Sequence, residues 1–239
     1  MGGSFVWTLT SVDIASGWTD VRAVWNRGQY TTCEGLEDIK DSQPFDLKGV
    51  DSDNGAEFLN HHLYDWLKKQ DIQQTRSRPY HKNDQAHVEQ KNYSHVRLLL
   101  GDDRLEHPEV IPTINKLLKI WCLWRNLYCV TMEQTSKRRE GSKQILTHAK
   151  TNRTPAQRLL DGSSLTSTQR EWLKSEQGSH NPFAMKRQIG NLLKRVWREN
   201  GQLARASLAG KAVSERSGGT ALPANRNQSR KQGAMVSCK

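Results

Sequence analysis

Two carboxylate side chains in this sequence are spaced so that they could bind a metal ion together. Asp53 follows a short apolar segment and precedes Asn54 and Gly55, which favours a turn at the end of a strand. Glu89 lies further along, early in a predicted helix, and 35 residues separate the two. Carboxylate oxygens at a strand end and on a nearby helix can converge on Mg²⁺ or Mn²⁺. Such ions activate a nucleophile and stabilise the leaving group in phosphoryl transfer, so the pair predicts chemistry on phosphodiesters.

The segments around this pair predict an α/β fold. Alternating and β-branched residues indicate strands at residues 5–12 and 19–25, joined as a hairpin, and shorter strands at 47–51 and 72–75. Apolar residues at helical spacing predict helices at the following segments: residues 30–40, 56–70, 83–101, 110–130, 155–160, 167–177 and 182–199.

Four short segments resemble the catalytic core of DDE transposases and retroviral integrases. They are residues 12–18, 51–58, 79–81 and 87–92. The resemblance covers residues 5–92, and residues 93–198 are similar to the helical extensions of bacterial insertion-sequence transposases. It implies a ribonuclease-H-like mixed sheet with flanking helices and a function in transposition, that is, DNA integration and recombination.

By this resemblance, Asp53 is the second acidic residue of the family's catalytic site and Glu89 the third, and both are ligands of Mg²⁺ or Mn²⁺. Gln85 lies four positions before Glu89, and Asn92 and Tyr93 follow it by three and four. In a regular helix all three would share the face of Glu89 and could contact DNA. A polar face turned to solvent is the alternative for these three residues.

Basic residues near this helix are candidate contacts for DNA phosphates: Arg76, Arg78 and Lys91. The basic segment 136–143 (SKRREGSK) is a further candidate. A solvated basic surface is the alternative for these positions.

The family pattern also requires an aspartate on a first, central strand. The first acidic residue of this sequence is Asp13, and only residues 1–4 precede the predicted strand 5–12. The resemblance therefore implies an N-terminally truncated core that lacks the acidic residue bridging two metal ions, so that Mg²⁺ or Mn²⁺ would bind weakly. Asp51 would point to the same strand face as Asp53 and is a conceivable substitute, but it lies deeper in the strand. Either the start is assigned too late within a longer reading frame, or the chain is a decayed remnant.

Charge and composition indicate an anionic partner. The 239 residues include 36 Lys and Arg against 25 Asp and Glu, a formal net charge of +11, which favours nucleic acid. No apolar run is long enough for a membrane span, and no GxxxxGK[ST] loop indicates a nucleotide cofactor. The four cysteines form no CxxC pair, so a cytoplasmic protein in a reducing compartment is expected.

We expect three regions: a partial integrase core at residues 1–105, a helical extension at 106–200 and a disordered basic tail at 201–239. The tail has seven basic residues against one acidic residue and no aromatic residue, a composition that cannot bury enough apolar surface to fold.

Two functions stay open. The first is a DDE-type recombinase core that hydrolyses a DNA phosphodiester and transfers the freed strand end, with this chain an inactive or incomplete fragment. The second is a non-catalytic DNA-binding remnant of a transposase, which could join homo-oligomers with full-length relatives. A ribonuclease-H-type nuclease would share the fold and the metal ions but would not explain the segment at residues 87–92.

Overall fold

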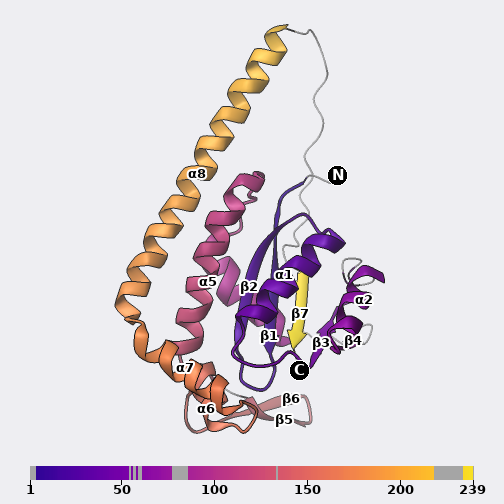
Figure 1. The fold of residues 1–239 in the computed structure, drawn as a ribbon, viewed down its shortest axis with the longest axis vertical. Helices are drawn as coiled ribbons and strands as arrows, with labels where there is room; N and C mark the ends of the chain where they lie inside the picture. The colour runs from indigo at the N-terminus through magenta and orange to yellow at the C-terminus, as the bar shows by residue number, and fades with distance from the viewer. Residues whose placement is uncertain are drawn as a thin grey trace.

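The hairpin predicted at the start of the chain is present as β1 (Val6–Asp13) and β2 (Thr19–Trp25), which pair antiparallel from Val6 opposite Trp25 to Val12 opposite Thr19. A tight turn that includes Gly17, at φ +75°, connects them. The computed structural model describes residues 4–53, 55, 58, 61–76, 86–132, 134–217 and 234–238 (Figure 1). Within these residues, no helix is long and apolar enough to cross a membrane.

The hairpin belongs to a five-stranded mixed sheet in the order β2-β1-β7-β3-β4. The strands β3 (Gly49–Ser52) and β4 (Gln73–Arg76) are parallel to each other and confirm two predicted strands. The central strand is β7 (Ala234–Cys238), which is parallel to β1 and antiparallel to β3.

The position of β7 differs from the expectation that the central strand is missing. Residues from the end of the chain lie where the resemblance assigned the family's first strand, between β1 and β3. An empty position there would leave backbone amides and carbonyls unpaired on both neighbours, inside the sheet. The predicted disorder of residues 201–239 is therefore wrong for residues 234–238, because β7 gains ladder partners on both sides.

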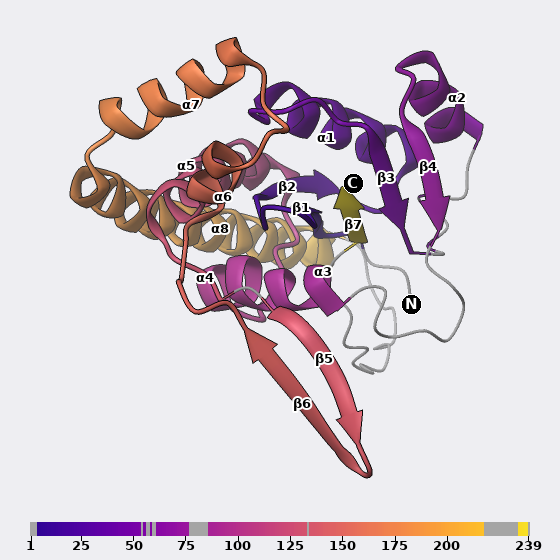
Figure 2. The same ribbon diagram turned by 90° about the horizontal axis from the view of Figure 1, so that it is seen from below.

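Helices cover both faces of the sheet (Figure 2). The first face carries α1 (Gln29–Ser42) and α2 (His61–Lys69), whose apolar residues pack with Leu9 of β1 and Val50 of β3. The second face carries α3 (Ala86–Lys91), followed by the π-helical segment η2 (Asn92–Arg97) and the short α4 (Leu98–Leu100). The predicted helix stop at Gly101 is confirmed, with a φ of +75°.

The helices after residue 105 pack on the same core as the sheet. Here lie η3 (Pro108–Val110), α5 (Ile111–Tyr128) and the long α8 (Pro182–Ser217). One apolar cluster joins Val21 and Ala23 of β2 to Leu117 of α5 and Val196 of α8. The expected boundary near residue 105 therefore does not separate two cores. The helix α8 also continues well past its predicted end, and Leu203 packs against this cluster, so the disorder predicted from residue 201 is wrong up to Ser217.

Two further helices and a second hairpin complete the described chain. The helices α6 (Pro155–Asp161) and α7 (Ser167–Ser179) begin at capping boxes made by Thr154 with Gln157 and by Thr166 with Gln169. The hairpin of β5 (Gln134–Glu140) and β6 (Lys143–His148) was not predicted, because the basic segment 136–143 indicated phosphate contacts but no strand.

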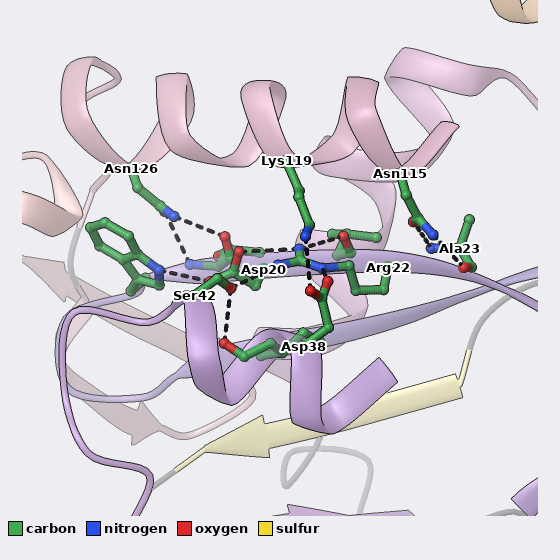
Figure 3. Close-up of polar contacts among 12 residues, drawn as sticks. Asp20, Arg22, Ala23, Asp38, Ser42, Asn115, Lys119 and Asn126 are labelled. Atoms are coloured by element: carbon green, nitrogen blue, oxygen red, sulfur yellow. Dashed lines mark hydrogen bonds and ion pairs between the residues drawn. The ribbon is translucent and has the colours of Figure 1, made fainter. Parts of the chain in front are cut away.

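The edge strand β2 is closed by polar side chains of α5 (Figure 3). Asn126 accepts from the Thr19 amide at 3.0 Å and donates to its carbonyl at 2.9 Å, and Asn115 makes the same pair of bonds with Ala23 at 2.7 and 3.0 Å. These side chains replace the missing neighbour strand, so the backbone of β2 is satisfied at the edge of the sheet.

A charged network lies between these two asparagines and joins β2 to α1 and α5 (Figure 3). The guanidinium of Arg22, 2% exposed, contacts Asp38 through Nε, lies 3.4 Å from Asp20 and donates to Ser42 Oγ at 2.7 Å. Lys119 donates to the other oxygen of Asp38 at 2.8 Å. Burial raises the pKa of Asp20, and the Arg22 charge opposes this shift. Burial of Asp38 acts in the same direction, but its bonds from Lys119 and Arg22 prevail and hold its pKa below the usual value.

We expect Arg22→Met to lower the free energy of unfolding at pH 7 by about 3–5 kcal/mol, because it leaves the buried Asp20 carboxylate without its cation. The loss should shrink as the pH falls, since burial raises the pKa of Asp20 and the carboxyl then takes up a proton, which leaves no buried negative charge for Arg22 to balance. Lys119→Met removes an exposed partner and should cost no more than about 1 kcal/mol. Urea denaturation from pH 4 to 7 measures both, and equal losses would contradict the role given to Arg22.

Removal of residues 218–239 should destabilise the protein, because β1 and β3 would then lose the strand between them. We expect the melting temperature to fall by about 5 °C or more, the shift that a loss of roughly 2 kcal/mol produces in a chain of this size. The matched control keeps residues 234–238 and replaces residues 218–233 by a Gly/Ser linker of equal length. Thermal unfolding followed by circular dichroism compares the two, and an unchanged midpoint in the truncated chain would refute the central position of β7.

Candidate active site

Asp53 lies directly after the last residue of β3, as the sequence predicts. Its side chain is half-buried, and its Oδ1 accepts a hydrogen bond from the Gly55 amide at 2.9 Å. This bond closes a turn on the strand end and fixes one carboxylate oxygen. The strand itself is held by β7 on one side and β4 on the other, so Asp53 has a rigid support.

Glu89 lies on α3, which packs on the sheet beside β1 and β7. The next residue back, Val88, is 1% exposed and anchors the helix, whereas Glu89 is exposed. The structure thus places Asp53 at the end of a strand of the main sheet and Glu89 on a helix that covers the same sheet.

The face predicted for Asn92 is wrong. Asn92 is 6% exposed, and its Oδ1 accepts a 2.7 Å hydrogen bond from Thr10 Oγ1 on β1. Asn92 lies four residues after the buried Val88, so both residues share the helix face that packs on the sheet. Asn92 instead ties the helix to the sheet. Tyr93 is 57% exposed, as a residue facing DNA must be.

The remaining candidate contacts for DNA differ in their surroundings. Arg76 is exposed at the end of β4. Lys91 is half-buried, and burial together with the positive charges of Arg125 and Arg158 lowers its pKa to about 8. The remaining candidates, Arg78 and Gln85, lie outside the described residues.

Arg125 and Arg158 were missed by the sequence analysis. They reach the neighbourhood of Lys91 from α5 and α6, and no spacing in the sequence connects three cations so far apart in the chain. Their effect is a concentration of positive charge beside the helix that carries Glu89, which favours an anionic ligand.

Other carboxylates near the strand ends serve structural purposes. Asp51 Oδ1 accepts a 2.5 Å hydrogen bond from Thr75 Oγ1 across β3 and β4. Asp13 Oδ2 accepts from the amide and the hydroxyl of Ser16, at 2.9 and 2.5 Å, and so holds the turn between β1 and β2. These contacts argue against Asp51 as a substitute for the acidic residue that the resemblance requires.

The described residues do not fit a complete metal centre. Asp53 and Glu89 offer the hard oxygen donors that Mg²⁺ and Mn²⁺ prefer. Within the part of the chain that the structure describes, however, no three His, Cys, Asp or Glu side chains are grouped so that they could hold a metal ion.

Comparisons with known proteins agree with the resemblance in the sequence. Residues 1–82 match the family model described as "Integrase core domain". An uncharacterized protein, y4rM of Sinorhizobium fredii (strain NBRC 101917 / NGR234), is 38% identical over 143 residues, which is 60% of this chain and 41% of the relative. This chain therefore spans less than half of the relative's length. The strands β1 to β4 and Asp53 all lie within the residues that match this family model.

Proposed function

We propose that this protein acts on DNA in transposition or integration, through a ribonuclease-H-like integrase core. Residues 1–82 match the integrase core model, and the net charge of +11 favours a polyanionic partner. A mixed sheet with helices on both faces is consistent with an integrase core fold and supports the proposal.

The observation that carries the proposal is the placement of Asp53 and Glu89. Asp53 directly follows β3, which lies between β7 and β4, and Glu89 lies on the exposed side of a helix packed on the same sheet. The matched segment ends before Glu89, so the role of this residue rests on the helix position and on the sequence resemblance.

In this proposal Asp53 and Glu89 face the reacting phosphodiester. Arg76 and Lys91 hold the DNA backbone near them, and the exposed ring of Tyr93 contacts the DNA beside Glu89. Proteins with an integrase core generally use divalent metal ions. Since the described residues do not fit a complete metal centre, we propose that the 239-residue chain by itself binds DNA without cutting or joining it.

One observation favours the alternative of a DNA-binding protein without catalysis. Among the described residues, Asp51 and Asp13 lie on the sheet and could supply a third carboxylate. Asp51 already accepts a hydrogen bond from Thr75, and Asp13 accepts two from Ser16. A chain with cations around a metal site that lacks a ligand would still bind duplex DNA through contacts of Lys and Arg with the phosphates. Association of such chains into homo-oligomers is a further prediction.

Replacement of the acidic pair should strengthen DNA binding. Asp53→Asn combined with Glu89→Gln removes two negative charges close to the proposed phosphate position, so we expect affinity for a short DNA duplex to rise by about threefold to tenfold at low salt. Glu109→Gln combined with Glu171→Gln removes the same charge from exposed positions elsewhere and is the control. Fluorescence anisotropy measures both. An equal gain in the two variants would contradict the position given to Asp53 and Glu89.

The 239-residue chain should not nick supercoiled plasmid DNA in Mg²⁺ or Mn²⁺ above the background of the Asp53→Asn, Glu89→Gln variant, because no third possible ligand is grouped with these carboxylates among the described residues. Gel electrophoresis of the plasmid gives the readout. Nicking by the unmodified chain that disappears in this variant would show that further ligands complete the site and that the chain is an active recombinase or nuclease.

A further inference from the structure

The hairpin of β5 and β6, called here the β5–β6 arm (residues 134–148), projects from the body of the protein (Figure 2). None of its described residues belongs to the three apolar clusters of the core. An isolated two-stranded hairpin is at best marginally stable in water, so an arm of this kind is expected to function against a partner surface.

The arm has a regular ladder near its tip. Arg138 pairs with Ile145, Arg139 with Gln144, and Glu140 with Lys143. Gly141 in the connecting turn has a φ of +61°, which a two-residue hairpin turn requires and which glycine adopts without strain. The geometry is therefore that of a narrow ribbon rather than of an irregular loop.

The charge on this ribbon is strongly positive. Within residues 134–148 there are four Lys and Arg residues and one acidic residue. Arg138, Arg139 and Lys143 are exposed, and Arg138 and Arg139 point to opposite faces because they are adjacent in a strand. Glu140 forms an ion pair with Arg138 at 3.1 Å and so neutralises part of one face.

The chain just before the arm is fixed to the turn between β1 and β2. Arg158 of α6 donates to Thr131 Oγ1 at 2.8 Å and to the Thr131 carbonyl at 2.5 Å, and the same guanidinium donates to the Ser16 carbonyl at 3.0 Å. Thr131 also pairs with Arg153 in an isolated bridge. Since Ser16 lies in the turn between β1 and β2, Arg158 links Thr131, just before the arm, to the main sheet.

We propose that the β5–β6 arm lies in the major groove of duplex DNA, with Arg138, Arg139 and Lys143 on the flanking phosphates. The major groove admits a two-stranded β-ribbon, and a ribbon with cations on both faces can reach both of its walls. This inference rests on the proposed function, since it names the surface that holds the DNA, and it adds a contact region far in sequence from Asp53 and Glu89.

The test compares two triple variants of the full chain in binding to a short DNA duplex. One carries Arg138→Gln, Arg139→Gln and Lys143→Gln, and the control carries Lys174→Gln, Arg187→Gln and Lys194→Gln, which removes the same charge from exposed helix positions. The arm variant should bind about tenfold or more weakly near physiological salt, and its plot of log K against log salt should be shallower by roughly 2 to 3, since each phosphate contact contributes about 0.9. The control should change the slope by less than about 1.

Two further measurements sharpen the test. Glu140→Gln frees Arg138 from its ion pair and should tighten DNA binding by about twofold or more. An RNA duplex of equal length has a deep, narrow major groove, so the arm variant and the unmodified chain should bind it equally. An equal loss on RNA would overturn the groove placement.

The outcomes separate this inference from the proposed function. If both triple variants lose affinity equally, the arm proposal fails while DNA binding by the protein stands. If the unmodified chain does not bind duplex DNA, both proposals fail. A circular dichroism spectrum unchanged by the substitutions shows that the variants retain the fold.

Discussion

The fold depends on how the outer edge of β2 is closed. A strand at the edge of a sheet exposes a row of amides and carbonyls, and here α5 supplies the missing partners through Asn115 and Asn126. Between them, Arg22 lies buried with Asp20 and binds Asp38, which also binds Lys119 of the same helix. These bonds join the sheet to the segment after residue 105, and the same parts of the chain share one apolar cluster.

This shared core determines what the candidate site can be. The sheet positions Asp53 at the end of β3, and the helix α3 carries Glu89 while Val88 and Asn92 attach it to β1. Cations from later helices, Arg125 and Arg158, add positive charge near Lys91. The helical part of the chain is therefore electrostatically part of the site, which a division at residue 105 would conceal.

The structure also shows two contacts between segments that are distant in the sequence. The strand β7 lies at the centre of the sheet and pairs with both β1 and β3. Arg158 joins the turn between β1 and β2 to Thr131, three residues before the β5–β6 arm. In both cases residues from the later part of the chain bond to backbone groups of the segment that contains β1 to β3.

The sequence by itself determined the hairpin β1–β2, the strands β3 and β4, and most of the helices, because periodicity, turn residues and helix caps act over a few residues. It also located Asp53 at a strand end and Glu89 on a helix. Only the tertiary structure decided the partner of Asn92, the place of β7 and the closure of β2 by α5. Asn92 is buried by its hydrogen bond to Thr10 of β1, a residue 82 positions away in the sequence. The neighbours of β2 and β7 depend on hydrogen bonds between residues about a hundred or more positions apart, and no local pattern encodes such pairings.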